Sequence, residues 1–493
     1  MTTHAIKHSR ELAGNRAGLA VGPRHAYIVF ATVAVALLMS SLDSTIVAVS
    51  LPTMLSELNT DLPWLSWSLT GYLFSQSIIM PVAGKLSDRL GPRRVFLFSV
   101  ILFTASSAAA GLAPNVYLLI LFRVLQGIGG GAFMPSVTGV VCDMFGNRRA
   151  SAIGLLSSFM PMGAIIGPNL GGIIIDHVSW RWVFFVNVPI GAVVLALGIL
   201  LLPRSKCVAP GHSIDVTGAG LLSGAVLAIL YGMTNLAENH GEFGLLPAVM
   251  FSAGAVLLSL FIRHEVRVAN PIIELRVLRT RPFIATNVYN FVLGAAMFGV
   301  ISFIPYYAMV AYGMTAGQSG ILLTPRSVAV IVFSTASSFC LVRFRYRKPM
   351  LLGLITLAIS LILLSRGYRD STMFGFGVHD VLLLSLILGI TGVGMGVANP
   401  ASNNAVLDLM PDKAAEITGV RGMFRTVGGV FGGAAVVLAL SRFQDKALGM
   451  QTIYLSFGVL LLLLIPLVFM IPDSPHARSE HRRRHGAGPS GGQ

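Results

Sequence analysis

Asp43 and Arg123 are oppositely charged residues that stand inside long apolar stretches of the sequence. Of the 20 acidic residues, Asp43 is the only one that we place well inside such a stretch. A charged side chain at the centre of a bilayer costs about 3 kcal/mol or more unless it faces a partner or water, which makes it a functional candidate. Burial raises the pKa of a carboxyl group and a nearby cation lowers it. A carboxylate subject to both influences can take up and release a proton near neutral pH.

The elements that must position these two residues are apolar helices. The chain has 493 residues, of which 54% are hydrophobic and 11% are charged, and its mean hydropathy is +0.77. Globular chains contain about 25% charged residues, so the composition excludes an ordinary soluble enzyme. A spanning helix needs about 20 mostly apolar residues. Fourteen stretches meet this requirement, and they predict an all-α membrane protein: 26–50, 62–83, 94–113, 115–140, 151–175, 182–202, 214–236, 246–263, 283–311, 317–341, 349–365, 379–404, 416–440 and 452–471.

Basic residues predict the orientation of these spans. With a cytoplasmic N-terminus, 26 of the 35 Lys and Arg residues fall in cytoplasmic segments and five fall outside. Because Lys and Arg accumulate in cytoplasmic loops, we expect both termini in the cytoplasm and the protein in the plasma membrane. The net charge of +15 then reflects topology, and no nucleic-acid partner is expected. The remaining basic residues fall within spans: Arg123, Arg326, Arg421 and Arg425.

The sequence repeats itself at an offset of 265 residues. Ten identities occur without a gap: Gly127/Gly392, Gly129/Gly394, Gly131/Gly396, Pro135/Pro400, Asp143/Asp408, Ala150/Ala415, Gly154/Gly419, Phe159/Phe424, Gly163/Gly428 and Gly167/Gly432. Close packing of glycine-rich membrane helices would explain the glycines but not the shared aspartate. Parallel repeats are typical of transporters, with the substrate path between the halves. The expected organisation is a tail (1–25), a six-helix half (26–202), two inserted helices (203–263), a cytoplasmic loop (264–282), a second six-helix half (283–471) and a basic tail (472–493).

Several motifs add to this pattern. The segment after the second span carries Gly84, Asp88, Arg89, Gly91, Arg93 and Arg94. Four further strings lie at 42–52, 123–129, 163–172 and 180–189. Together they resemble the major facilitator superfamily, and specifically its fourteen-helix drug:proton antiporter (multidrug efflux) branch, over almost the whole chain from Tyr27 to Ile471. In the second half, the basic string 343–348 lacks the aspartate of the signature loop, so a symmetric second lock is not expected.

The resemblance implies roles for two of these motifs. The first segment, with Asp88 among four cations, is expected to act as a conformational lock on the cytoplasmic side. The second is the antiporter motif of the fifth span, which comprises Gly163, Gly167, Pro168, Gly171 and Gly172. In the family this region seals the leak between the two sides of the membrane. Simple helix packing by small residues at four-residue spacing is an equal alternative, and both can hold.

Depth in the membrane relates Asp43 to Arg123. Asp43 lies seven residues before Ser50, about 10 Å from the outer end of its span, and Arg123 lies eight residues after Asn115, about 12 Å from the outer end of its own. We therefore expect Asp43 to carry the coupling proton and Arg123 to modulate either the pKa of Asp43 or the gate. The alternative is a static buried ion pair.

Other polar side chains at membrane depth are candidates for lining a substrate path, because they should face protein or water rather than lipid. They are Tyr72, Gln76, Gln126, Asn287, Asn290, Tyr306, Asn399 and Asn403, and Phe298 can add a stacking face. For each of them, an interhelical hydrogen bond is an equally good explanation.

These features predict a monomeric, proton-coupled exporter of amphipathic or hydrophobic small molecules that works by alternating access in the lipid bilayer. Export of one endogenous metabolite or lipid on the same fold is the alternative. No phosphate-binding loop of the G-x-x-x-x-G-K-[ST] type occurs, so ATP-driven transport is not expected. The three cysteines form no CxxC or Cys/His cluster, and we expect neither a metal site nor a cofactor. A membrane enzyme or receptor is disfavoured because the sequence contains no catalytic constellation or sensory domain.

Overall fold

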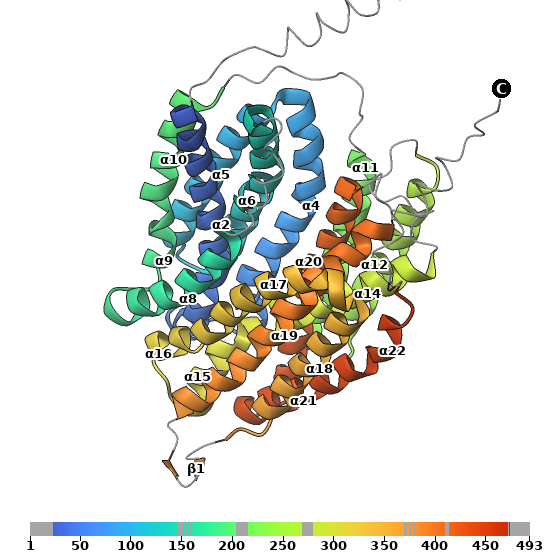
Figure 1. The fold of residues 1–493 in the computed structure, drawn as a ribbon. Coiled ribbons are helices and arrows are strands. Elements are labelled where there is room, and N and C mark those ends of the chain that lie inside the picture. The colour runs from blue at the N-terminus through green and yellow to red at the C-terminus, as the bar shows by residue number, and fades with distance from the viewer. Residues whose placement is uncertain are drawn as a thin grey trace, which may run out of the picture.

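The computed structural model describes residues 23–145, 152, 155–156, 159–203, 215–268, 280–368, 372–373, 376–377, 380–409, 414–471 and 473. These residues form a helical bundle (Figure 1). Twelve of the described helices are long and apolar enough to cross a membrane. The prediction of an all-α membrane protein is therefore confirmed at this level. A hairpin of two-residue strands, β1 (Thr372–Met373) and β2 (Phe376–Gly377), is the one departure within the described ranges.

The first half of the bundle follows the predicted order of spans. Its helices are α2 (Pro23–Glu57), α3 (Leu62–Leu65), α4 (Trp67–Leu90), α5 (Pro92–Gly111), α6 (Val116–Phe145), α8 (Phe159–His177), α9 (Trp182–Phe185) and α10 (Asn187–Leu201). Within this half α6 packs against α4 and α5, and α2 packs against α8.

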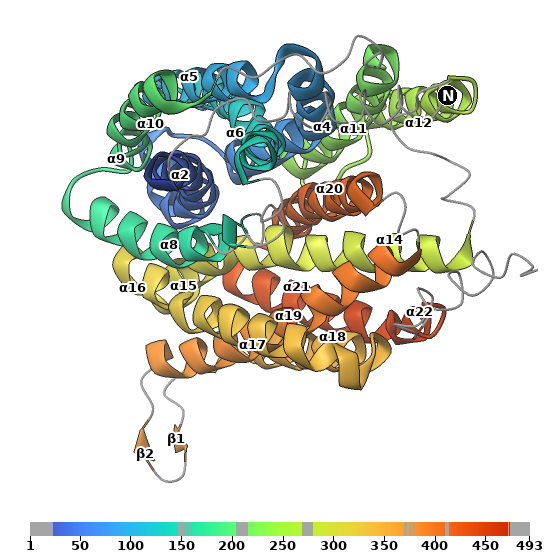
Figure 2. The ribbon, with the colours of Figure 1, turned by 45° about the horizontal axis from the view of Figure 1, so that its top comes forward.

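The second half uses the same packing partners in the same order. Its elements are α14 (Arg281–Gly294), the π-helix η2 (Ala295–Val300), the 3₁₀ turn η3 (Ile301–Phe303), α15 (Ile304–Tyr312), α16 (Ala316–Ile321), α17 (Thr324–Phe344), α18 (Arg347–Leu364), α19 (Asp380–Leu409), α20 (Ala414–Ser441), α21 (Lys446–Leu463) and α22 (Ile465–Val468). Here α19 packs against α17 and α18, and α20 packs against α14. The pair α6 and α19, related by the sequence repeat, thus has equivalent neighbours in the two halves (Figure 2).

The two remaining long helices, α11 (Val216–Glu238) and α12 (Leu245–Glu265), pack on each other at the edge of the bundle (Figure 2). Asp215 caps α11, since its side chain accepts a hydrogen bond from the Gly218 N–H at 2.8 Å. The inner side of α11 contacts α20, and Trp67 Nε1 on α4 donates to Thr234 Oγ1 at 2.8 Å. The insert therefore touches both halves.

The predicted signature loop is largely helical, which corrects our expectation that the second span ends at residue 83. Helix α4 continues through Gly84 to Leu90, and only Gly91 separates it from α5, which begins at Pro92. Gly91 has a φ of 89°, a value that side chains strongly disfavour, and proline is suited to the first turn of the next helix. The turn thus needs one residue, and the residues before it continue the helix.

Several predictions fall outside the described residues. They concern most of the N-terminal tail, all of the C-terminal tail except Asp473, residues 204–214 before α11, and residues 269–279 in the loop between α12 and α14.

Candidate functional site

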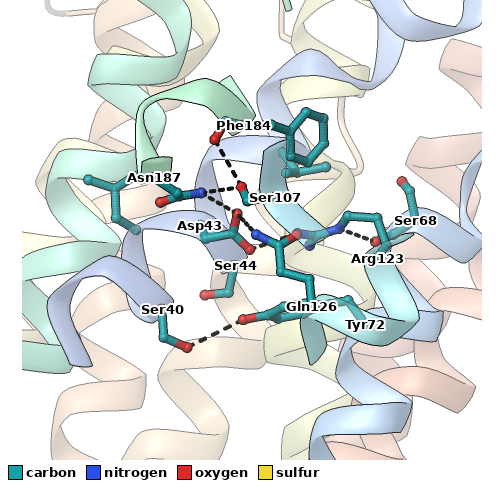
Figure 3. A network of polar contacts seen from close by, with 12 residues as sticks. Ser40, Asp43, Ser44, Ser68, Tyr72, Ser107, Arg123, Gln126, Phe184 and Asn187 are labelled. Carbon is teal, nitrogen blue, oxygen red and sulfur yellow. Dashed lines mark hydrogen bonds and ion pairs between the residues drawn. The ribbon is translucent and has the colours of Figure 1, made fainter. Parts of the chain in front are cut away.

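A buried ion pair joins Asp43 on α2 to Arg123 on α6 (Figure 3). Arg123 NH1 donates to Asp43 Oδ2 at 2.7 Å, and both side chains are fully shielded from solvent. The sequence placed these residues at one depth, and the structure brings them into direct contact.

Two amides complete the coordination of the Asp43 carboxylate. Gln126 Nε2 and Asn187 Nδ2 each donate to Asp43 Oδ1 at 2.8 Å. Asn187 Nδ2 also lies 3.0 Å from Ser107 Oγ, and Ser107 donates in turn to the Phe184 carbonyl at 2.9 Å. Three helices therefore meet at one carboxylate, α2, α6 and α10, and α5 supports it through Ser107. A buried carboxylate with three donors is well satisfied in its charged form.

The guanidinium of Arg123 is held from several sides. Its Nε donates to the Ser68 carbonyl at 2.9 Å, and its NH1 also donates to Gln126 Oε1 at 2.7 Å. Its centre lies 4.1 Å from the ring centre of Tyr72, whose hydroxyl is 3.3 Å from Ser40 Oγ. Its NH2 has no hydrogen-bond partner among the described residues. Arg123 thus retains contacts that do not depend on Asp43.

Sequence reasoning missed Asn187 and assigned Gln126 to the substrate path. Gln126 uses both its amide nitrogen and its oxygen within the ion-pair network, so it belongs to the Asp43 site. Asn187 is the first residue of α10, directly after the short helix α9. The signal available in the sequence was a single amide within the otherwise apolar string 182–189.

The other substrate candidates are distributed through the bundle. Asn287 and Asn290 are buried, and each donates to a carbonyl of its own helix. Tyr306 is buried, whereas Gln76 and Asn403 are half-buried. Tyr72 lies against Arg123. Asn399 and Phe298 meet in a second polar cluster, described next.

This second cluster lies in the C-terminal half around Asn399 on α19. Asn399 Oδ1 accepts hydrogen bonds from Arg421 NH2 and Arg425 NH1, both at 2.9 Å. Arg425 also lies over the ring of Phe298, 5.5 Å from its centre. Sequence reasoning placed both arginines within spans but assigned them no role.

The glycines of the predicted antiporter motif divide between two contacts. A Cβ added at Gly163 would lie 2.6 Å from Ser41 Cβ, and one added at Gly171 would lie 2.5 Å from Ile46 Cγ1, so both residues allow α8 to approach α2. Gly167 on α8 also faces α2, where Thr45 is its neighbour. Gly172 is different, because its added Cβ would lie 2.6 Å from the Cα of Gly317 in the other half. Pro168 also faces the other half, since its carbonyl would block a Cβ at Gly320.

The predicted lock residues lie at the junction of α4 and α5. Arg93 NH2 donates to the Ile199 carbonyl of α10 at 2.6 Å, while Arg89 and Arg94 are exposed. A Cβ at Gly84 would meet nothing within 4 Å. Asp88 lies in α4, but its side chain is outside the described part of the structure.

The two halves touch where α8 ends and α16 begins. Asp176 Oδ2 accepts hydrogen bonds from the Gly317 N–H at 2.8 Å and from Thr315 Oγ1 at 3.1 Å. Asn169 Nδ2 donates to Thr324 Oγ1 at 2.7 Å.

Helices α4 and α20 form a second contact between the halves. They meet where a Cβ at Gly433 would lie 3.0 Å from Thr70 Cγ2. Toward Lys85 they enclose, with α11, an apolar cavity of about 620 Å³ that includes space open to solvent. The halves are thus in contact where α8 meets α16, and a cavity lined by both halves and the insert lies near Lys85.

Comparison with known proteins assigns this architecture. The sequence profile of the Major Facilitator Superfamily matches residues 33–433 and 287–491. The chain belongs to the Major Facilitator Superfamily. It is thus a multi-pass membrane transporter and not an enzyme. The solved structure of a mutant of the nucleoside transporter NupG has the same fold, with a TM-score of 0.63 at 13% identity, covering 90% of this chain and all of that one.

Curated members of the superfamily are similar over most of their length. The tetracenomycin C resistance and export protein of Streptomyces glaucescens is 34% identical over 420 residues, which cover 84% of this chain and 76% of that protein. The multidrug transporter protein MdtP of Bacillus subtilis (strain 168) is 29% identical over 400 residues, or 81% and 72% of the two chains. A multidrug resistance protein B homolog of Mycobacterium tuberculosis (strain H37Rv) is 30% identical over 416 residues, or 82% and 74%.

Proposed function

We propose that this major facilitator protein exports amphipathic or hydrophobic small molecules in exchange for protons. The observation that carries the proposal is the Asp43 carboxylate, which is fully buried at membrane depth and bound by Arg123, Gln126 and Asn187. The names of three relatives, each a resistance or multidrug transport protein, support export as the direction of transport and a broad range of substrates.

The proton works through the ion pair. When Asp43 is ionised, its charge attracts Arg123 and holds α2 against α6. When Asp43 takes up a proton, this attraction is lost, while Arg123 keeps Ser68, Gln126 and Tyr72 as partners. The contact between α2 and α6 then weakens without leaving the guanidinium bare. Helix α2 also packs against α8, which carries Gly172. Protonation of Asp43 can therefore alter the contact between the halves through α8.

We infer an orientation and a conformational state from the same features. Fourteen spans result if α4 and α8 join the twelve most apolar helices, and both termini then lie in the cytoplasm of a plasma-membrane protein that acts as a monomer. In this orientation the contact of Asp176 with α16 is on the outside, and the cavity near Lys85 opens toward the cytoplasm. The state described is then closed to the outside, which suits loading from the cytoplasm.

Proteoliposome transport tests the proposal. Purified protein is reconstituted with an imposed pH gradient, and a panel of compounds that includes tetracenomycin C is assayed for movement against its gradient. Wild type is compared with Asp43→Asn and with Asp61→Asn, which changes an exposed carboxylate that makes no side-chain cap bond at the start of α3. We expect proton-driven movement with wild type and Asp61→Asn and none with Asp43→Asn, at equal yields of folded protein. Uphill transport by Asp43→Asn at the wild-type rate contradicts the proposal.

Export of one specific metabolite is the second candidate, and the tetracenomycin relative favours it, because that protein is named for a single compound. The same panel separates the two functions. Movement of several unrelated compounds indicates multidrug efflux, and movement of one structural series indicates a dedicated exporter.

A further inference from the structure

Three arginines of the C-terminal half lie at membrane depth without an acidic partner among the residues that the structure describes. They are Arg326 on α17 and Arg421 and Arg425 on α20. Arg421 is 7% exposed, and the other two are half-buried. Between described residues, ion pairs join Asp43 to Arg123 and Asp215 to His264, and none of the three arginines is neutralised by a described carboxylate.

Their hydrogen bonds are few, and half of them go to weak acceptors. Arg421 and Arg425 share one amide oxygen of Asn399, Arg425 NH2 lies 2.8 Å from Met297 Sδ, and Arg326 NH2 lies 3.5 Å from Met395 Sδ. A thioether sulfur is a weak acceptor. The Nε atoms of all three arginines are buried and have no partner among the described residues.

Tyr289 is a further buried donor in this half of the bundle. Tyr289 on α14 is fully buried, and its hydroxyl has no described partner. It stands on α14, which packs against both α19 and α20. Arg326 contacts Met395, which lies one helical turn before Asn399 on α19, the residue that Arg421 and Arg425 share. Donors from α14, α17 and α20 therefore converge, and the described residues supply no anion to receive them.

The depth of the cluster places it near the middle of the bilayer. Arg425 stands 11 residues after Ala414, about 16 Å along α20. Arg326 stands 10 residues after Ala316, about 15 Å along α16 and α17 from the opposite side. A hydrocarbon core is about 30 Å thick. Unpaired cations are most costly at this depth, which makes an anionic occupant favourable.

The repeat shows that helix geometry does not require these arginines. At the offset of 265 residues, Arg421 corresponds to Leu156 and Arg425 to Met160 in the first half. Leu156 is fully buried in an apolar cluster. The N-terminal half instead carries its arginine on α6, paired with Asp43. The positive cluster is thus a property of the second half alone.

We propose that Arg326, Arg421 and Arg425, with Tyr289, bind the anionic group of the transported molecule, so that the preferred substrates are amphipathic organic acids such as carboxylates. The side chains of Phe298, Met297 and Met395 border the arginines and offer apolar contact to the rest of such a molecule. This substrate class rests on the proposed function as an exporter. The binding site itself does not require that transport be coupled to protons.

Equilibrium binding to full-length protein tests the assignment. Naphthalene, anthracene and pyrene are each used as acetic acid, acetamide and trimethylammonium derivatives, and binding to protein in phosphatidylcholine nanodiscs is measured by isothermal titration calorimetry. Wild type is compared with Arg425→Gln, Arg421→Gln and Arg326→Gln. The charge-conserving variant is Arg425→Lys, and the control is Arg366→Gln, which removes an exposed charge near the end of α18.

We expect the acids to bind wild type more tightly than the matched amides and cations. Loss of one charge-assisted hydrogen bond should raise the Kd of the acids by about 10- to 100-fold in the Gln variants. Arg425→Lys should lose less affinity than Arg425→Gln, and Arg366→Gln should bind as wild type does. Size-exclusion profiles and Tm values establish that each variant is folded. If a Gln variant does not fold, the proposal is still tested by the Kd values of Arg425→Lys and by the relative Kd values of the acids, amides and cations for wild type.

Two results overturn the proposal. One is that the acids bind wild type no more tightly than the amides, or that folded Gln variants bind them as wild type does. The other is that nanodiscs of phosphatidylglycerol abolish acid binding, which would assign the arginines to a lipid headgroup. Neither result depends on transport. If the acids bind but no compound moves in a pH gradient, the proposed function fails and this site stands. If only cations are exported and acids do not bind, the site fails and the exporter stands.

Discussion

Replacement of Gly172 by alanine should shift the conformational equilibrium of the transporter toward the state that is open to the outside. Gly172 lies on α8 where the two halves meet. A Cβ at this position would lie 2.6 Å from Gly317 Cα and 2.7 Å from the Ala316 carbonyl oxygen. Both are backbone atoms of the other half, and neither can rotate away. The added methyl therefore conflicts with the state described, which we propose is closed to the outside.

The magnitude follows from the overlap. Ordinary contacts between carbon atoms lie at about 3.5–4.0 Å, so the methyl group would intrude by about 1 Å. Overpacking of this kind costs about 1–3 kcal/mol. Separation of the halves removes the clash, so the cost falls on one state only, and the ratio of the two states should change by about 5- to 150-fold.

Distance measurements on the outer face can detect this change. Spin labels at Val178 and Ile321, which are exposed on opposite halves near the contact, report their separation by pulsed electron paramagnetic resonance. We expect longer distances in Gly172→Ala than in wild type. Gly422→Ala is the matched control, because a Cβ at Gly422 would meet nothing within 4 Å. Identical distance distributions in wild type and Gly172→Ala would refute the reasoning, as would an equal shift in the control.

Two further predictions concern stability. Arg123→Met leaves the Asp43 carboxylate buried without its cation and should destabilise the protein by about 3–5 kcal/mol, whereas the double variant Asp43→Asn/Arg123→Met should regain much of the lost Tm; a double variant as unstable as Arg123→Met would contradict this. At Asp215, burial opposes ionisation, but hydrogen bonds from the Gly218 N–H and His264 and the charge of Lys85 outweigh it and lower the pKa of the carboxyl from 3.8. Asp215→Ala should therefore lower the free energy of unfolding by about 1 kcal/mol at pH 7. The Tm difference from wild type should shrink as the pH falls below about 4, because a carboxyl with a lowered pKa stabilises the fold only while it is ionised. A Tm difference that is independent of pH would count against this role of Asp215.

Much of the fold could be predicted from the sequence because a bilayer restricts the structures that a chain can adopt. Apolar length alone located the helices, since a membrane-spanning backbone must satisfy its hydrogen bonds internally. The residues at which the helices end were harder to predict. Helix α4 continues past residue 83 because Lys85, Asp88 and Arg89 are compatible with a helix that emerges into water, and only the positive φ of Gly91 marks the turn. The π-helix η2 left no periodic signal that would distinguish it from the α-helix before it.

The site was predictable to the extent that it depended on depth. Asp43 and Arg123 could be placed at one level by counting residues from the span ends, and the structure puts them in contact. The amides that complete the network could not be found in this way. Gln126 and Asn187 face Asp43 because of how α6 and α10 are rotated about their axes, which is a property of packing. The partner of Gly172 was likewise not predictable from the sequence. The motif grouped Gly172 with Gly163, but Gly163 faces α2 and Gly172 faces Gly317 of the other half.

The two halves repeat one architecture but distribute charge differently, and this difference bears on energetics. The N-terminal half holds a buried ion pair at which we propose that the proton acts, while the C-terminal half holds arginines without a described counterion. If a proton enters as an organic anion leaves, both movements carry charge in the same electrical direction. Each elementary charge that crosses the membrane contributes about 2.3 kcal/mol per 100 mV. An inside-negative potential would then drive both steps of the exchange, so the proposed anion site is energetically compatible with the proposed role of Asp43 as proton carrier.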